Sequence, residues 1–299
     1  MKCDYEAKVL ADSINLDTGD RLTTFELTFP RFILAEVNTH RMFSRNSASS
    51  RAIPVHKRIA AIRANPFVPM AFCANKRGMQ AGDELDEQAA SAARTAWLMS
   101  CATACQQAEA MAKAKVHKQW ANRLLEPFAW HTAIVSATEW ANFFALRAHP
   151  DAQPEFRTVA EMAQELYREH TPEELKPGMW HLPMLAPMEL NNVRALSFDW
   201  DAFGTTHSNW PELLRWIKIS VGRCARVSYL THDGKRDPKA DIELCDRLHQ
   251  SGHMSPLEHA AVARDGRVRT APDGINRWGN FTGFMQYRKT IFGEAVFNG

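Results

Sequence analysis

The segment from Asp83 to Lys118 constrains the fold most, because it contains no Gly or Pro and is rich in Ala. Its acidic residues lie mainly at the start and its lysines toward the end, an order that suits the dipole of a helix. We therefore predict one long helix over this segment. Cys101 and Cys105 lie one turn apart on it and are predicted to be small core residues rather than ligands.

Two other segments predict strands. The residues from Thr24 to Pro30 alternate apolar and polar side chains, as expected for a half-buried strand, and the run from Thr132 to Thr138 predicts a buried one. Further helices are predicted at residues 139–147, 155–170, 210–224 and 238–252, with a strand near 260–264 and an irregular loop at 65–82. No internal repeat or low-complexity linker divides the chain. We expect one α+β domain spanning residues 1–299.

The composition excludes several classes of protein. With 299 residues, 45% of them hydrophobic and 23% charged, the chain can bury a core and is neither disordered nor fibrous. No stretch of about 18 uncharged apolar residues is present, so no membrane-spanning helix is expected. The first ten residues contain acids where a signal peptide needs an apolar run, and the six cysteines are scattered. Both observations predict a cytoplasmic protein.

Charge is unevenly distributed along the chain. Residues 37–82 contain eight Lys and Arg residues and no carboxylate, whereas the whole chain has a net charge of +2, so the remainder carries −6. Such a basic segment indicates an anionic partner, either a nucleic-acid backbone or a small phosphate-bearing ligand, although a solvated basic loop also fits. Nucleic-acid surfaces usually interleave cations with aromatic side chains. Here the spacers are Ser, Asn and Ala.

The densest cluster of polar residues is THRMFSRNSASSR, residues 39–51. Guanidinium groups bind phosphate bidentately, and small hydroxyl side chains allow the backbone to approach it. The composition is therefore that of a phosphate pocket, with a surface turn as the alternative.

Other kinds of site find little support in the sequence. No Gly-x-Ser-x-Gly elbow surrounds the serines of this cluster, so no nucleophilic triad is predicted. His253 and His259 are six residues apart, which fits neither a helical pair of metal ligands nor a zinc finger, so no metal site is predicted. Without a Walker or Gly-x-Gly-x-x-Gly loop, a dinucleotide cofactor would bind outside the Rossmann scheme. His181 is expected to be a packed core histidine.

The cluster at residues 39–51 resembles the signature of the flavin-dependent thymidylate synthases, Arg-His-Arg-x-x-Ser-x-Asn-Glu-x-Ser-x-Arg. The matching residues are His40, Arg41, Ser44, Asn46, Ser49 and Arg51. Two further segments are similar to motifs of the same family. NFFALRAHPDAQPEF, residues 142–156, resembles its Asn-Phe-x-x-Leu-Arg and Ala-Gln-x-Glu-Ile, while CARVSY and GHMSPLEHA, within residues 224–260, resemble its Ala-Arg-Val-Ser and Gly-His-x-Ser/Thr-Pro-Phe-Glu-His.

The order of these motifs differs from that of the family. Its Ala-Arg-Val-Ser and Gly-His-x-Ser-Pro segments precede the signature, whereas here they lie near the C-terminus, and the strand that should follow Glu-His is near the start of the chain. The resemblance therefore implies a circularly permuted α+β fold of the flavin-dependent thymidylate synthase type, a mixed sheet packed by long helices. Permutation leaves contacts in place when the termini lie near one another. Residues 60–110 and 171–215 have no secure counterpart.

The resemblance also implies a chemistry and a set of site residues. In the family, FAD lies across a homotetramer interface, NADPH reduces it, methylenetetrahydrofolate provides the carbon, and the pyrimidine nucleotide is alkylated at carbon 5. The implied flavin contacts are His40, Arg41, Asn46, Asn142, Ser228, Ser255 and Glu258. Ser49, Ser50 and Arg51 would hold the nucleotide phosphate, together with Arg123 from a neighbouring subunit. Arg147 would stabilise the uracil enolate, and Ser49, close to the base, is interpreted as a binder rather than a nucleophile.

Departures from the family pattern leave the choice of pyrimidine open. Thr39 and Ser47 replace an Arg and a Glu of the signature, and the other differences are Glu36, Ser136 and Asp151. The leading substrate is dUMP. A related enzyme that methylates or hydroxymethylates UMP or dCMP is the first alternative, because a pocket that hydrogen-bonds one base edge rejects another. A nucleic-acid-binding protein that uses residues 37–82 is the second.

Overall fold

The larger of two sheets is mixed, which confirms the α+β prediction. The computed structural model describes residues 4–78, 80–196, 209–234, 236–266 and 278–291. The strands of the larger sheet are β1 (Glu6–Asn15), β2 (Arg21–Pro30), β3 (Ser44–Ser47), β4 (Trp130–Ala137) and β5 (Glu173–Leu175), in the order β3-β4-β2-β1-β5. β5 runs parallel to β1, whereas the other neighbouring pairs are antiparallel.

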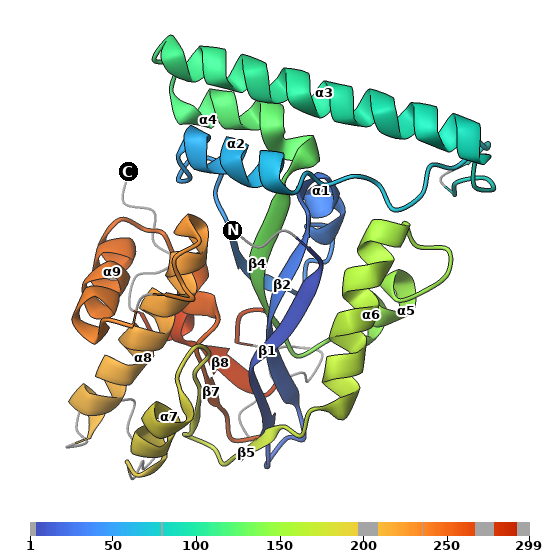
Figure 1. The fold of residues 1–299 in the computed structure, drawn as a ribbon. Helices are drawn as coiled ribbons and strands as arrows, with labels where there is room; N and C mark the ends of the chain where they lie inside the picture. Colours follow the sequence, from blue (N-terminus) through green and yellow to red (C-terminus); the bar gives the residue numbers. More distant parts are fainter. Residues whose placement is uncertain (1–3, 79, 197–208, 235, 267–277, 292–299) are drawn as a thin grey trace, which may run out of the picture.

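The strand β2 lies at the centre of this sheet and is buried on both faces. Phe25, Leu27 and Phe29 pack on one face in the hydrophobic cluster that also holds α5 (Ala141–Arg147) and α6 (Pro154–Glu169). Thr24, Glu26 and Thr28 point to the opposite face and are also buried. The prediction of a half-buried strand is therefore wrong, because the C-terminal part of the chain covers the polar face (Figure 1).

Two buried histidines join that polar face to the C-terminal part of the chain. Nε2 of His181 lies 2.8 Å from Oγ1 of Thr24, and Nδ1 of His259 lies 2.9 Å from Oγ of Ser136. Burial lowers the pKa of both imidazoles to about 3, so both are neutral. His181 belongs to a second sheet of β6 (Trp180–His181), β7 (Ala261–Ala263) and β8 (Phe284–Gln286). Its assignment as a core histidine is confirmed.

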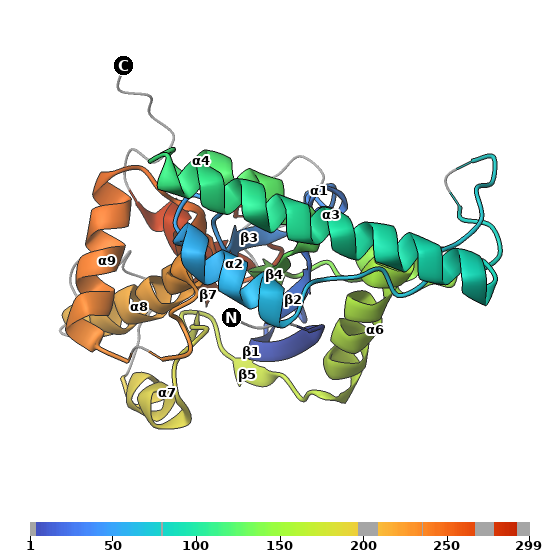
Figure 2. The same ribbon diagram turned by 45° about the horizontal axis from the view of Figure 1, so that its top comes forward.

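The predicted long helix is α3 (Glu87–Lys113), which is shorter at both ends than the segment from which it was predicted. The carboxylate of Asp86 accepts a hydrogen bond from the Ala89 amide and caps the helix. The helix α3 packs on α2 (Val55–Ala64) and on a 3₁₀ segment, η2 (Asn122–Phe128), beside the short α4 (Lys118–Ala121). Figures 1 and 2 show this group over one end of the large sheet. Cys101 and Cys105 are buried in its core, as predicted.

The other predicted elements are present with small changes of boundary. The C-terminal helices are α7 (Pro187–Arg194), α8 (Trp210–Ala225) and α9 (Pro238–Gln250), and short 3₁₀ segments η3 (Arg226–Tyr229) and η4 (Ser255–Glu258) follow α8 and α9. The apolar residues after β2 form η1 (Arg31–Ile33) and α1 (Leu34–Val37), and η5 (Tyr287–Thr290) follows β8. The elements that were not predicted from the sequence are β1, β3, β5, β6, β8, α1, α2, α4 and α7.

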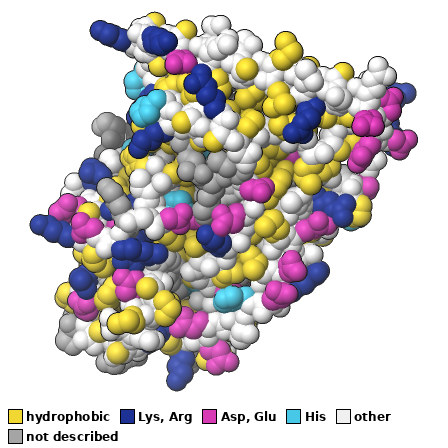
Figure 3. All heavy atoms as spheres, viewed as in Figure 1, with side chains coloured by type: hydrophobic (Ala, Val, Ile, Leu, Met, Phe, Trp, Pro, Cys, Tyr) yellow, Lys and Arg dark blue, Asp and Glu magenta, His cyan; other side chains and the backbone are white. Residues whose placement is uncertain are grey.

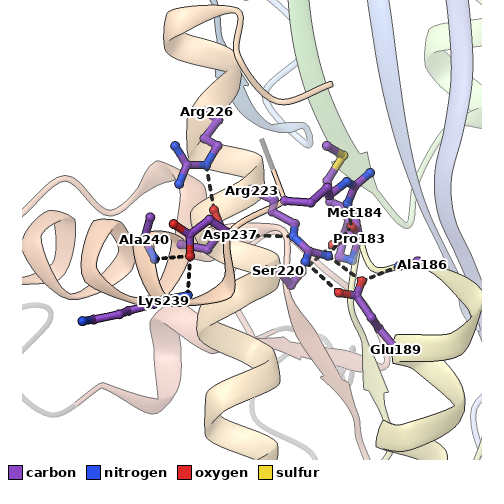
Figure 4. A network of polar contacts seen from close by, with 12 residues as sticks. Pro183, Met184, Ala186, Glu189, Ser220, Arg223, Arg226, Asp237, Lys239 and Ala240 are labelled. Atoms are coloured by element: carbon purple, nitrogen blue, oxygen red, sulfur yellow. Dashed lines mark hydrogen bonds and ion pairs between the residues drawn. The ribbon is translucent and has the colours of Figure 1, made fainter. Parts of the chain in front are cut away.

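A buried ion network holds α7, α8 and α9 together. Arg223 forms two hydrogen bonds with Glu189, of 2.5 and 2.7 Å, and a third with Asp241 at 3.2 Å (Figure 4). Arg226 Nε donates to the other oxygen of Asp241 at 2.6 Å. Gly222 permits the close approach, because a Cβ there would lie 2.2 Å from the backbone oxygen of Asp241. The network therefore sets the position of the chain segments that follow both helices.

Removing the shared carboxylate is expected to destabilise the fold strongly. Asp241→Ala leaves the guanidinium groups of Arg223 and Arg226 partly uncompensated in a buried site, which costs about 3–5 kcal/mol of unfolding free energy. Urea denaturation followed by circular dichroism measures this. Asp246→Ala on the same helix, which removes a more exposed partner of Lys218, is expected to change the free energy by no more than about 1 kcal/mol. Equal losses in the two variants would contradict the role of the network.

Candidate active site

A small polar cavity lies along β3 and the turn that follows it. Its volume is about 300 Å³. The residues that line it are Arg31, Arg45, Asn46, Ser47, Ala48, Ser49, Ser50, Arg51, Arg123 and Ser255. Four arginines and four serines line it and no carboxylate does, so the cavity is suited to an anion. We call it the arginine pocket.

Backbone hydrogen bonds fix the turn that forms this pocket. The amide of Ser49 donates to the carbonyl oxygen of Ser228 at 3.1 Å. The side-chain amide of Asn122 donates to the carbonyl oxygens of Ser50 and Ile53, at 2.7 and 2.8 Å. Two separate parts of the chain therefore hold the serines in place before any ligand binds.

A larger cavity of about 570 Å³ adjoins the arginine pocket. The two share Asn46, Ser49, Arg51 and Ser255. The larger one is also lined by Ala52, His117, Lys118, Ala225, Ser228, Tyr229, Leu248, His253 and Pro256. Both polar and apolar residues thus line a space of the size that cofactor sites occupy.

The C-terminal motifs lie against the signature strand, as a circular permutation requires. The side-chain amide of Asn46, on β3, donates to the Cys224 carbonyl at 2.9 Å, and the Ser228 hydroxyl donates to Oδ1 of Asn46 at 3.4 Å. β3 also contacts both η3 and η4. Segments separated by about 180 residues in the chain therefore form one site.

His40 and Arg147 form a second cluster, outside both cavities. Nε of Arg147 donates to Nε2 of His40 at 3.0 Å, and its guanidinium lies 4.7 Å from the ring centroid of Phe156. Burial, followed by the charges of Arg147 and Arg45, lowers the pKa of His40 to about 4. Arg45 joins the cluster to the arginine pocket, because its guanidinium donates to the His40 carbonyl at 3.0 Å while it lines the pocket.

The structure brings together only part of the residue set that the resemblance implied. Seven residues line the two cavities: Asn46, Ser49, Ser50, Arg51, Arg123, Ser228 and Ser255. Arg123, which the resemblance assigns to a neighbouring subunit, lines the arginine pocket together with Ser50 of the same chain. Arg41 and Asn142 are exposed. Glu258 pairs with Arg288, with 2.5 Å between Oε1 and Nη1.

The sequence analysis missed several residues of the site. Arg31 lies six residues before the basic segment at 37–82. Because Glu36 stands between Arg31 and that segment, the count of basic residues did not include Arg31. Glu126 lies three residues after Arg123 in the sequence, but its contacts depend on the tertiary fold. His117 and Lys118 were assigned to the long helix, whereas the chain turns away from that helix before them.

The basic segment at residues 37–82 does not form one surface. Arg58 is buried, with 2% of its surface exposed, and Arg63 pairs with Glu109 at 3.0 Å. Arg45 and Arg51 line the arginine pocket. On the face seen in Figure 3, Lys and Arg lie among Asp and Glu rather than in a single basic patch.

Comparison with known proteins identifies the family. The family described as thymidylate synthase complementing protein (Thy1) matches residues 22–173, half of the chain. The chain belongs to this family, that of the flavin-dependent thymidylate synthases. The match begins in β2 and ends after α6. It therefore includes the signature and the adjacent strands β2 and β4.

The other comparisons give more distant relationships. No curated protein matches the chain. Among solved structures, the chain is similar to a UMP/dUMP methylase, PolB, from Streptomyces cacaoi, in its forms bound with 5-Br dUMP and with 5-Br UMP. The sequence identity is 15% in both comparisons, over 56% of this chain and 91% and 90% of the other chains, with TM-scores of 0.44 and 0.47. Of the helices in the described residues, none is both long and apolar enough to cross a membrane.

The half-buried, neutral state of His40 predicts a pH dependence of stability. Its pKa is about 4 in the fold and near 6.5 in the unfolded chain, so the unfolded chain binds more protons between these values. The unfolding free energy should therefore decrease as the pH falls from about 6.5 toward 4. Urea denaturation across this range is expected to show a shallower dependence for His40→Gln. The exposed His56→Gln serves as control, and an equal change in both variants would contradict the assignment.

Proposed function

We propose that the protein is a flavin-dependent thymidylate synthase that methylates dUMP at carbon 5, with NADPH and methylenetetrahydrofolate as co-substrates. One observation carries the proposal: a pocket of arginines and serines, lined largely by the family signature, adjoins a cofactor-sized cavity to which the C-terminal family motifs contribute. A phosphate and a cofactor would thus lie side by side, as the transfer of a one-carbon unit to a nucleotide requires.

The arginine pocket suits the nucleotide phosphate. Arg51 and Arg123 present guanidinium groups, which bind phosphate oxygens bidentately, and the hydroxyls of Ser49 and Ser50 add short hydrogen bonds. The turn is already held by Ser228 and Asn122. Binding therefore needs little reorganisation of the backbone, and the fixed phosphate would orient the base for reaction.

The larger cavity has the donor set that FAD needs. Asn46, Ser228, Ser255 and His253 would face the polar atoms of the cofactor, and Lys118 would face its pyrophosphate, beside Arg51. FAD, when bound, supplies the hydride chemistry that amino-acid side chains cannot perform. The protein groups hold the nucleotide and the cofactor next to each other and require no thiol nucleophile.

The cluster of His40 and Arg147 would complete the site from another copy of the chain. We propose a homotetramer with active sites at the subunit interfaces, because neither residue lines the cavities of its own chain. Arg147 would stabilise the negative charge that develops on the pyrimidine when carbon 6 receives hydride. His40, neutral and accepting from Nε of Arg147, would hold that guanidinium in position.

One observation favours the related methylase or hydroxymethylase of UMP or dCMP as the second candidate. Oε2 of Glu36 is buried and has no hydrogen-bond partner among the described residues. Ser47, which replaces a Glu of the signature, lines the arginine pocket. Both are departures from the family pattern that change hydrogen-bonding groups in or just before the signature, and they would change which base edge is accepted. Nucleic-acid binding has less support, because the basic segment is dispersed between the interior, an ion pair and the pocket.

Product analysis tests the proposal directly. The purified protein with FAD, NADPH and methylenetetrahydrofolate is offered dUMP, UMP and dCMP separately, and each product is identified by mass spectrometry. Methylated dUMP is the expected product. A methylated or hydroxymethylated product from UMP or dCMP alone would replace the thymidylate synthase with the related enzyme. Absence of both flavin uptake and product would contradict both.

Replacing Arg51 is expected to impair use of the nucleotide. Arg51→Ala removes charge-assisted hydrogen bonds to the phosphate, each contributing about 1.5–3 kcal/mol, so kcat/KM should fall about 10- to 100-fold. Arg63→Ala is the matched control, since Arg63 belongs to the same basic segment but pairs with Glu109 on the surface. Similar losses in both variants would indicate a general effect of charge rather than a phosphate contact.

A further inference from the structure

The carboxylate of Glu126, on η2, lies among donors of the arginine pocket. Its Oε1 accepts hydrogen bonds from Nε of Arg31 at 2.8 Å, from Oγ of Ser50 at 2.6 Å and from Nη1 of Arg123 at 3.0 Å. Arg31, Ser50 and Arg123 all line the pocket, whereas Glu126 does not. One internal carboxylate thus binds three of the groups that the pocket would offer to an anion.

The charges around Glu126 are unbalanced. Arg58 is buried nearby, and its Nε and Nη2 have no hydrogen-bond partner among the described residues. Burial, followed by the charge of Arg31, lowers the pKa of Arg58 to about 10, against an opposing contribution from Glu126. Burial also lowers the pKa of Arg31, and Glu126 opposes this shift too. The two guanidinium groups therefore depend on the same carboxylate.

Glu126 is charged in this environment. Burial alone would raise its pKa, but the hydrogen bond from Ser50 and the charge of Arg31 outweigh burial, and the pKa is lowered from its ordinary value. A single negative charge then faces Arg31, Arg58 and Arg123, which leaves net positive charge for a ligand to neutralise.

The three donors differ in how freely they can leave Glu126. The Arg123 side chain is 55% exposed and lies on the surface of η2, and the Ser50 hydroxyl can change partner by rotation. Arg31 is 9% exposed and is held on its other side, where Nη1 lies 2.8 Å from Nδ1 of His131. Arg123 and Ser50 are thus the exchangeable donors, and Arg31 is the fixed one.

We propose that Glu126 is an internal counter-anion with which the ligand phosphate competes. In the free protein its carboxylate binds Ser50 and Arg123. When a phosphate enters the pocket, these two donors transfer to it, and Glu126 remains paired with Arg31. Glu126 therefore lowers phosphate affinity while it stabilises the free pocket. The inference rests on the proposed function only for the identity of the molecule that carries the phosphate.

Calorimetric titration with inorganic phosphate, at fixed ionic strength, tests the competition. Glu126→Gln is expected to bind phosphate about three- to tenfold more tightly than the wild type, because Ser50 and Arg123 no longer leave a carboxylate. Its Tm without phosphate should fall, and phosphate should raise that Tm more than it raises the wild-type value. Glu109→Gln, which removes the same charge from an exposed pair with Arg63, should leave phosphate affinity unchanged.

The proposal is overturned if folded Glu126→Gln binds phosphate no more tightly than the wild type. It is also overturned if Glu109→Gln gains as much phosphate affinity as Glu126→Gln does. If Glu126→Gln does not fold, Glu126→Asp decides the question. The shorter side chain keeps a charge for Arg31 but reaches less far toward Ser50 and Arg123, so its phosphate affinity must also exceed the wild-type value.

Titration with dUMP separates this inference from the proposed function. Tighter phosphate binding by Glu126→Gln, without dUMP binding by either protein, supports the counter-anion and contradicts the nucleotide substrate. If the wild type and Glu126→Gln bind phosphate with the same affinity and both also bind dUMP, the counter-anion is overturned and the proposed function stands. Absence of phosphate binding in both proteins also overturns the counter-anion.

Discussion

The structure depends on the burial of a polar sheet face. The side of β2 that carries Thr24 and Thr28 would be solvated in a two-layer fold, yet here it is covered by the C-terminal part of the chain. Covering it requires partners for buried hydroxyl groups. His181 and His259 meet the hydroxyls of Thr24 and Ser136, and they can do so because both imidazoles remain neutral.

This docking has a direct consequence for the site. The segments that follow α8 and α9 are placed by the network of Arg223, Arg226 and Asp241, and from there they reach β3. Asn46 then bonds to the carbonyl of Cys224. Residues of these segments line the larger cavity, so its geometry depends on this ion network as well as on the residues that line it.

Much of the fold followed from the sequence, but less of the site did. The apolar run of β4 predicted a buried strand, and the Ala-rich composition and charge order of α3 predicted a long helix. Helices were also predicted where α6, α8 and α9 lie. β8 and β3 are short, and β3 is composed of polar residues that no strand pattern describes. Family motifs predicted the pocket serines and Arg51. Arg31 and Glu126 contact each other although they lie 95 residues apart in the sequence, and neither belongs to a family motif or a periodic pattern.

Charge illustrates why the site could not be read from composition. The basic segment contributes eight cations to the sequence, but the fold uses them for different purposes. Arg58 is buried, and Arg45 donates to two backbone carbonyls, those of Val37 and His40. The potential of the pocket depends on Arg31 and Arg123, which lie outside the segment, as well as on Arg45 and Arg51, and on the carboxylate of Glu126. A local count of charges measures how basic a segment is, whereas an anion site is defined by which guanidinium groups the fold leaves incompletely neutralised.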